Sequence, residues 1–376
     1  MLFSEVIGQK ALKRLLTESV TENRISHAYL FPGLPGYGTL SLALAYAQYI
    51  LCTGDKEKDS CGVCPSCKKV EKLIHPDLHF VFPVVTSKNN SKPVSDDYIE
   101  LWREQVLETS YFNYYQWINK ISNENKQGII NTFESSQIHK KLNMKSYESE
   151  YKIMIIWSAD RMNIACANKI LKILEEPPDR TVFMLITEYP DALLPTIVSR
   201  TQIVNVPQID SESLEKYLIE KHGLEKSKAG DLARISYGDY NTALNYIDVS
   251  DEFRFNQDNF ISFMRISWAG KAKEISSWVD AISKSSREKQ RELLLYFLRT
   301  LRENLLLNLG IMENVSMTAS EKAFAEKFSR FIHAGNIELM EKEINTAIYH
   351  IERNGYSKLI FYDLCIKIGK LLKMKI

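Results

Sequence analysis

The sequence predicts an α/β protein in which a parallel-sheet domain precedes helical domains. Short apolar runs alternate with helical patterns up to Pro207, and a Gly/Pro-rich turn joins the first of these runs to a helix. After Pro207 the strand signal ends and helical periodicity takes over. With 376 residues the chain is too long for one comfortable core, so we expect two or three domains.

The predicted strands are short and apolar, as buried strands are. They are Ala28–Phe31, Leu78–Phe82, Lys152–Trp157, Val182–Ile186 and Gln202–Val206. Helical segments lie between them, notably Asn163–Glu176, which stops at Pro177. Strands that alternate with helices indicate a parallel sheet covered on both faces.

The polar segment 84–97 leads into an aromatic-rich helical insertion at about Asp97–Ile121, to which no function can be assigned from sequence. Short helices are expected at Ser211–Lys221, Lys226–Ser236 and Asn241–Ile247, and long amphipathic helices follow. We therefore expect an α/β domain at 1–207 with an insertion at about 84–130, a small helical domain at 208–249 and a larger helical domain at 250–376.

Composition excludes some classes of protein. A formal net charge of +1 provides no global field that would attract nucleic acid. The N-terminus does not have the pattern of a signal peptide, and the longest apolar stretch, Leu40–Cys52, is too short to span a bilayer. We therefore expect a cytoplasmic protein that does not engage a membrane.

Four of the six cysteines form a cluster at Cys52, Cys61, Cys64 and Cys67. In a cytosolic protein such a cluster favours a metal over disulfides. Four thiolates suit a closed, structural Zn²⁺ site, which would staple a loop at residues 52–67. An iron–sulfur cluster or unbound thiols remain alternatives, although the ferredoxin cysteine pattern is not matched.

The turn after the first strand has the frame of a phosphate-binding P-loop. Gly33, Gly36 and Gly38 stand where the backbone would wrap phosphate. However, Thr39 replaces the lysine that would reach the β- and γ-phosphates, and Leu40 replaces the hydroxyl that would hold Mg²⁺. Each lost contact is worth about 1.5–3 kcal/mol, so we expect no productive ATP binding. The alternative is an ordinary strand-to-helix turn.

The second half of an ATP site is also degenerate. The apolar strand at 152–156 has the character of a Walker B strand, but Trp157 and Ser158 stand where acidic residues would be needed. Asp160 lies further along and suits a helix cap. Ser199 and Arg200 lie between a helix and a strand, so Arg200 either projects from the domain edge or forms an ordinary surface ion pair.

Taken together, these segments resemble the AAA+ clamp-loader subunits of bacterial DNA polymerase III, and most of all the delta-prime subunit. The matching segments are Val6–Gln9, Ser26–Phe31, the cysteine module with His75–Asp77, Ala167–Pro178 and Leu193–Arg200. The motifs span roughly residues 3–247, and the rest matches only as a helical domain of suitable length.

The resemblance implies a role. In this family five subunits form a ring held by a C-terminal collar, here 250–376, while 208–249 would be the lid. ATP-binding subunits open the sliding clamp and place it on primed DNA. A delta-prime-like subunit has no intrinsic activity within the DNA-directed DNA polymerase holoenzyme, and lends an arginine finger, here Arg200 of the Ser199–Arg200 motif, to a neighbouring gamma/tau-like ATPase. A delta-like subunit is a further expected partner.

Some positions depart from the family pattern. Thr201 replaces a cysteine, the polar sensor position falls at about Thr187, and Thr242 replaces a basic sensor residue. One alternative is an ATP-hydrolysing gamma/tau-like subunit with an atypical site. Another is a zinc-dependent nucleic-acid-binding module, which basic residues near the cysteines would support; these are Lys56, Lys58, Lys68, Lys69 and Lys72.

Overall fold

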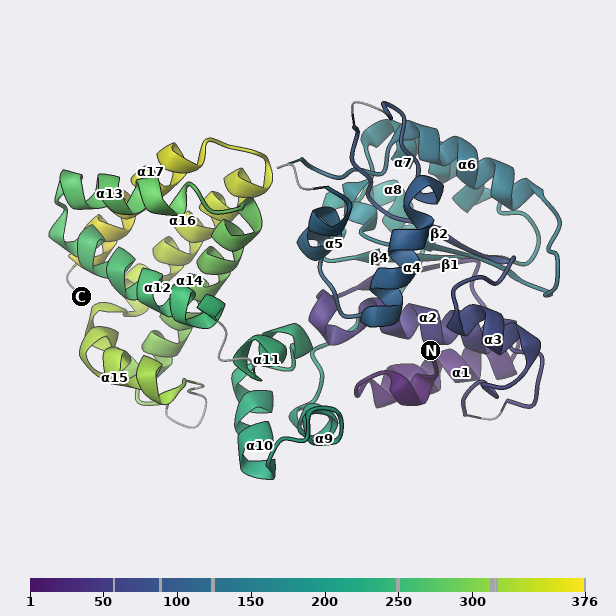
Figure 1. The fold of residues 1–376 in the computed structure, drawn as a ribbon, viewed down its shortest axis with the longest axis horizontal. Helices are drawn as coiled ribbons and strands as arrows, with labels where there is room; N and C mark the ends of the chain where they lie inside the picture. Colours follow the sequence, from purple (N-terminus) through teal and green to yellow (C-terminus); the bar gives the residue numbers. More distant parts are fainter. Residues whose placement is uncertain are drawn as a thin grey trace. The chain divides into compact units, whose positions relative to one another are not determined.

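The chain forms two compact units, Met1–Ala243 and Leu244–Ile376 (Figure 1). The computed structural model describes residues 1–56, 58–87, 90–122, 126–247, 251–311, 315 and 317–374. The expected boundary at 249/250 lies outside these residues, as do positions 88–89 and 123–125 of the expected insertion. The further division of the first unit at 207/208 stays a prediction.

The first unit contains a five-stranded sheet in the order β2-β3-β4-β1-β5, and every pairing is parallel. The strands are β1 (Ala28–Pro32), β2 (Leu78–Val81), β3 (Lys152–Ile156), β4 (Thr181–Thr187) and β5 (Gln202–Ile203). β5 is shorter than expected, although the Val204 and Val206 N–H groups still donate to Leu30 and Pro32. The predicted parallel α/β class is confirmed.

Helices cover both faces of the sheet, as the alternation of side chains requires. Tyr29 and Phe31 pack on the face covered by α1, α2, α4 and α5. Ala28 and Leu30 pack on the opposite face, against α6, α7 and α8. The helices of this unit are α1 (Lys10–Thr21), α2 (Thr39–Leu51), α3 (Pro65–Glu71), α4 (Ile99–Glu108), α5 (Tyr114–Ile121), α6 (Thr132–Asn143), α7 (Ile164–Glu175), α8 (Pro195–Val198), α9 (Ser211–His222), α10 (Lys226–Ile235) and α11 (Tyr240–Ile247), the last of which runs past residue 243.

The insertion is helical, as expected, and its helical part is interrupted once. The helical pattern expected over Asp97–Ile121 is broken into α4 and α5. Thr109 has extended backbone angles (φ −158°, ψ 140°) and ends α4, while the Asn113 side chain accepts from the Gln116 N–H and starts α5. Residues 110–112 therefore form a short connection between two helices.

The second unit is helical throughout its described residues. Its helices are α12 (Asp251–Ala269), α13 (Ala272–Ile282), α14 (Arg287–Asn308), α15 (Ala319–Phe328), α16 (Ala334–Glu352) and α17 (Ser357–Leu372). Buried aromatic and aliphatic side chains, such as Phe260, Phe297 and Phe361, give it a core of its own. No helix in the described part of the chain is both long and apolar enough to cross a bilayer.

Candidate metal centre and degenerate nucleotide site

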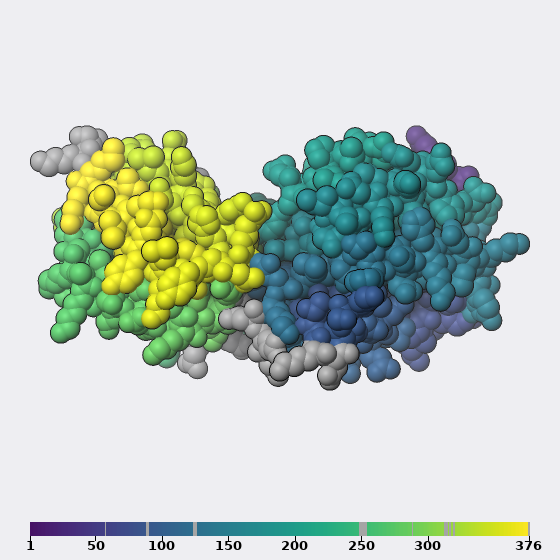
Figure 2. All heavy atoms as spheres, turned by 90° about the horizontal axis from the view of Figure 1, so that it is seen from above, coloured from purple at the N-terminus to yellow at the C-terminus, as the bar shows by residue number. Residues whose placement is uncertain are grey.

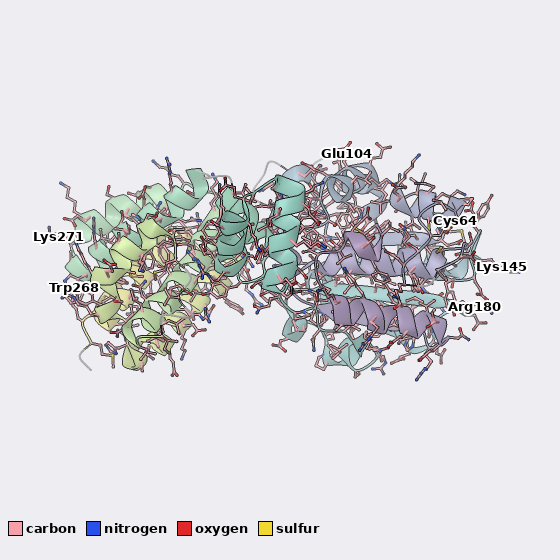
Figure 3. The ribbon with its side chains drawn as sticks, turned by 90° about the horizontal axis from the view of Figure 1, so that it is seen from below. Cys64, Glu104, Lys145, Arg180, Trp268 and Lys271 are labelled. Atoms are coloured by element: carbon pink, nitrogen blue, oxygen red, sulfur yellow. The ribbon has the colours of Figure 1, made fainter. Side chains whose placement is uncertain are left out.

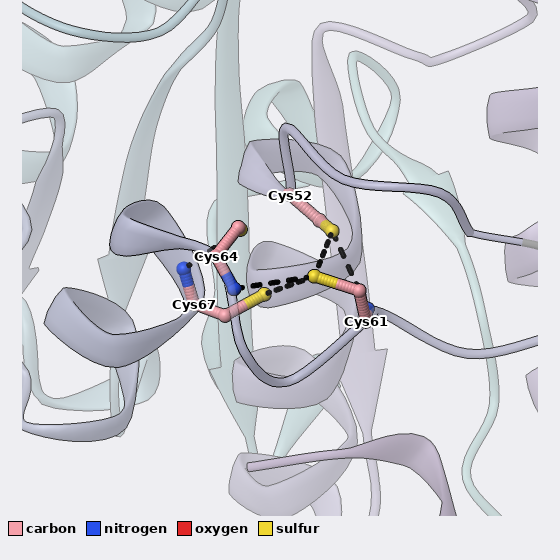
Figure 4. A group of neighbouring side chains, drawn as sticks. All are labelled: Cys52, Cys61, Cys64 and Cys67. Atoms are coloured by element: carbon pink, nitrogen blue, oxygen red, sulfur yellow. Dashed lines mark hydrogen bonds between the residues drawn. The ribbon is translucent and has the colours of Figure 1, made fainter.

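The structure brings the four clustered cysteines together (Figure 4). Their Sγ atoms all lie within 4.8 Å of one another. The Cys52 and Cys61 Sγ atoms are 3.6 Å apart, and those of Cys61 and Cys67 are 4.0 Å apart. Zn–S bonds of about 2.3 Å in a tetrahedron put sulfurs about 3.8 Å apart. The cluster therefore has the geometry of a closed, four-thiolate metal site.

The local backbone places the four cysteines and donates hydrogen bonds to their sulfur atoms. Cys52 follows the end of α2, and Cys64 caps the start of α3. The Cys61, Cys64 and Cys67 N–H groups each donate to the preceding cysteine sulfur at 3.4 Å. Backbone N–H groups of Val63 and Cys64 lower the pKa of the Cys61 thiol, which favours the thiolate that binds metal. Gly62, at φ +69°, allows the tight turn between Cys61 and Cys64.

Two charged residues that sequence reasoning did not single out for this task fasten the cysteine module. The Lys56 ammonium donates to the Tyr49 and Cys52 carbonyl oxygens, at 2.9 and 3.1 Å, at the C-terminal end of α2. The Asp59 carboxylate accepts from the Phe3 and Ser4 N–H groups, both at 2.9 Å. The module is thus tied both to α2 and to the N-terminal segment.

Two of the lysines near the cysteines have acidic partners. Lys68 pairs with Glu71 at 3.0 Å, and Lys69 pairs with Glu148. Cys64 lies at the same end of the first unit as Lys145 and Arg180 (Figure 3), and Arg180 pairs with Glu150. Acidic partners that accompany the cations weaken the case for nucleic-acid binding at this end.

Asp77, from the His75–Asp77 segment, has a structural role. Its carboxylate accepts from the Tyr147, Glu148 and Ser149 N–H groups at 2.6, 2.8 and 2.9 Å. Asp77 is 2% exposed and immediately precedes β2. It therefore anchors the loop that leads into β3, next to the Glu148 that pairs with Lys69.

The glycine-rich loop runs from β1 through a short turn at Pro35–Tyr37 into α2. Gly38 has φ +85°, a conformation that favours glycine. A Cβ at Gly33 would stand 2.7 Å from the Val206 carbonyl oxygen, so this glycine is needed for close packing. The Gln9 amide donates to the carbonyl oxygens of Tyr37 and Pro207, at 3.2 and 2.6 Å, and ties the loop to both flanking segments.

The two residues that replace the phosphate and Mg²⁺ ligands are buried. Thr39 and Leu40 are each 2% exposed, at the start of α2. The Leu40 side chain belongs to the core on one face of the sheet. These positions therefore contribute packing rather than charge to the loop.

The position after β3 is part of an aromatic cluster. The Trp157 ring lies 4.9 Å from Phe112 and 5.3 Å from Trp102, centroid to centroid, and both partners come from the insertion. Ser158 adopts the left-handed region at φ 52°. Asp160 accepts from the Thr187 hydroxyl at 2.8 Å, which accounts for the polar position at the end of β4.

Thr242 and Arg200 have different surroundings. The Thr242 N–H donates to the Asp239 carboxylate at 2.9 Å, at the start of α11. Arg200 follows α8; its guanidinium pairs with Glu175 at 2.6 Å and donates to the Thr196 carbonyl oxygen at 2.9 Å. Its side chain is 34% exposed, and the neighbouring Ser199 hydroxyl also donates to Thr196. Arg200 therefore lies at the surface, far less enclosed than the degenerate loop.

The fold and the site define a class of protein, namely a parallel α/β unit in which a glycine-rich loop joins β1 to α2 and a four-cysteine module follows α2. A family model described as "DNA polymerase III, delta subunit" matches residues 8–210, more than half of the chain. The chain therefore belongs to the DNA polymerase III delta-subunit family. The resemblance to clamp-loader subunits, drawn from the sequence motifs, is confirmed.

Individual relatives agree with this family. The chain is 32% identical over 213 residues to DNA polymerase III subunit delta' of Bacillus subtilis, which covers 57% of this chain and 52% of the relative. It is 29% identical over 199 residues to the gamma/tau subunit of Mycobacterium tuberculosis, covering 53% and 27%. A gamma subunit-related protein of Thermotoga maritima has a TM-score of 0.41 at 15% identity, with 97% and 99% covered. The chain spans about half or less of the length of these two curated relatives.

Proposed function

We propose that the chain is a non-hydrolysing, delta-prime-like subunit of a DNA polymerase III clamp loader. Its partners would be a gamma/tau-like ATPase and a delta-like subunit in a pentameric ring in the bacterial cytoplasm, which places the sliding clamp on primed DNA. One observation carries the proposal: the residues at the ligand positions of the ATP site, Thr39, Leu40 and Trp157, are all buried, and Leu40 and Trp157 belong to the hydrophobic core. The similarity to the Bacillus delta' subunit supports the same role.

The metal of the cysteine cluster is proposed to be Zn²⁺. Sulfur-only ligation with tetrahedral spacing and no open position is typical of structural zinc. Cys52 and Cys67 are buried, while Cys61 and Cys64 are partly exposed. The ion would join the end of α2 to the start of α3 and would take no part in catalysis.

The second unit is proposed to act as the collar. On α17, Leu359 is 69% exposed and Ile366 is 50% exposed, and Tyr356 just before this helix is 69% exposed. Figure 2 shows this last part of the chain, in yellow, on the surface of its unit. Exposed apolar side chains that form one patch are typical of surfaces that pack on other subunits.

Arg200 is proposed as an arginine finger that acts on the ATP of a neighbouring subunit. A guanidinium supplied in trans stabilises charge on the transferring γ-phosphate and is worth about 10³–10⁵ in rate in the systems where it is known. The ion pair with Glu175 is partly exposed, so little free energy is needed to release the side chain toward a neighbour.

The test is ATPase activity of the reconstituted complex with primed DNA. Arg200→Ala is expected to lower the rate at least tenfold while the complex still assembles, and Arg200→Lys is expected to restore little, because a lysine lacks the planar fork. Arg180→Ala is the matched control, since Arg180 is another surface arginine paired with a glutamate. Full activity of the assembled Arg200→Ala complex would rule out the finger, and ATP turnover by the purified chain would rule out the non-hydrolysing role.

A further inference from the structure

We propose that the insertion closes the degenerate nucleotide site from within: residues Ser110, Tyr111 and Phe112, together with Asp239, fill the cleft between the glycine-rich loop and the end of β3. The chain would then be closed to nucleotide by its own side chains, in addition to lacking the lysine and the hydroxyl that Thr39 and Leu40 replace. The inference rests on the proposed function in treating this cleft as the counterpart of a working ATP site.

Tyr111 occupies the space beside the glycine-rich loop. A Cβ at Gly38 would stand 3.0 Å from the Tyr111 ring and hydroxyl, so the phenol lies directly against the loop. The hydroxyl accepts from the Ile7 N–H at 3.0 Å, and the ring meets Tyr240 edge to face at 5.1 Å. Tyr111 is 5% exposed, and burial raises its pKa to about 12. A flat ring is thus held between the N-terminal segment, the loop and α11.

The residues on either side of Tyr111 close the neighbouring positions. The Ser110 hydroxyl lies 2.6 Å from the Ser41 hydroxyl, in the first turn of α2. Phe112 packs 4.9 Å from Trp157, which stands where a Walker B strand would end in an acid. Three consecutive residues of the 110–112 connection therefore contact the helix after the loop, the loop itself and the end of β3. Residues 110–112 of the insertion therefore lie against the segments that would form a nucleotide site.

Asp239 lies against a second glycine of the loop, Gly36. A Cβ at Gly36 would stand 2.0 Å from its Oδ1 atom, so the carboxyl group lies against the backbone that would wrap a phosphate. The carboxylate accepts from the Thr242 N–H at 2.9 Å and so is held in place as the cap of α11. Ionised, it would repel a phosphate at this position, and protonated it would still fill the space.

Two separate features would then prevent ATP binding, the lost ligands and the filled cleft. Restoring the ligands alone, with Thr39→Lys and Leu40→Thr, leaves Tyr111 and Asp239 in place. Opening the cleft alone, with Tyr111→Ala and Asp239→Ser, leaves the ligands missing; serine is chosen because it keeps a helix cap while removing the charge. Tight binding is expected only when both changes are combined.

The experiment is calorimetric titration of each full-length variant with Mg·ATP. The fourfold variant is expected to bind at least about tenfold more tightly than the ligand-restored variant, and the unaltered chain is expected not to bind. The matched control adds Tyr115→Ala to the ligand-restored variant, since the Tyr115 ring meets Tyr114 and comes from the same insertion. Equal affinity of the ligand-restored and fourfold variants would overturn the proposal, as would ATP binding by the unaltered chain.

A second measurement covers the case in which Tyr111→Ala does not fold. Tyr111→Phe keeps the ring but removes the acceptor for the Ile7 N–H. Hydrogen exchange at Ile7 should become at least about tenfold faster while ATP still fails to bind; unchanged exchange at Ile7 would overturn the placement of Tyr111. Neither result depends on Arg200. Evidence against the arginine finger would therefore not contradict the filled cleft, and evidence against the filled cleft would not contradict the arginine finger.

Discussion

Glu134, near the start of α6, is an acidic side chain held inside the first unit. It is 1% exposed, and its Oε2 atom accepts from the Ser95 N–H at 2.7 Å. Burial raises the pKa of its carboxyl to about 7, although the Ser95 N–H and the nearby Lys141 oppose that shift. Because Ser95 begins the turn before α4, Glu134 joins the insertion to the opposite layer of the unit.

We therefore expect a measurable pH dependence of stability from Glu134. A carboxyl whose pKa is raised in the folded state favours folding at low pH and loses that contribution as the pH rises from about 4.5 to about 7. Glu134→Gln should reduce the change in the free energy of unfolding across this pH range by about 1–3 kcal/mol. Urea unfolding across this pH range measures it.

The comparison must be made as a difference between wild type and variant. Burial lowers the pKa of His79 to about 4, and this side chain contributes a change of opposite sign, in which stability falls as the pH drops from 6.5 toward 4. His79 is present in both proteins, so its effect cancels. Parallel pH curves for the two proteins would contradict the role given to Glu134.

Residue identity alone is enough to predict that the ATP-site ligands are lost, because a lysine, a hydroxyl or an acid is either present in the motif or not. Thr39, Leu40 and Trp157 were recognised in this way. The side chains that are proposed to fill the site could not be recognised from the sequence. Tyr111 and Gly38 are 73 positions apart, and nothing in the local pattern of either residue predicts their contact. Asp239 and Gly36 are likewise 203 positions apart, and the sequence gives no sign of their contact.

Among the elements, the strands and the cysteine module followed most directly from sequence. Buried parallel strands are continuous apolar runs, and four cysteines at close spacing have few alternatives to a metal. The insertion was less predictable. Apolar and aromatic residues continue across the break between α4 and α5, so the pattern marks a helical insertion without locating the break, and no helix was predicted at α6 (Thr132–Asn143).

The cysteine module yields a prediction at this scale. Purified chain should contain about one zinc ion, and Cys64→Ser should lose it, because three thiolates and a hydroxyl hold Zn²⁺ less well than four thiolates. Metal analysis by mass spectrometry measures the content. Cys166→Ala is the control, since Cys166 is a buried cysteine of α7 outside the cluster, and it should retain the metal. Iron in place of zinc, or full zinc content in Cys64→Ser, would contradict the assignment.

The two units have separate cores, and this shapes how the molecule should unfold. The core of the first unit is built from the sheet and the helices around it, whereas that of the second comes from α12–α17. The four cysteines belong only to the first unit. A metal that binds only the folded form stabilises the part that binds it.

We therefore expect two calorimetric transitions, of which only one responds to zinc removal by a chelator. Phe297→Leu identifies the other: Phe297 is fully buried in α14, and the substitution should cost about 1–3 kcal/mol in the second unit alone. If the chelator and Phe297→Leu move the same transition, or if one cooperative transition responds to both, the two cores are coupled. Separate responses would mean that the α/β unit stays folded independently of the helical unit. Such independence is expected if the helical unit alone packs against neighbouring subunits as the proposed collar.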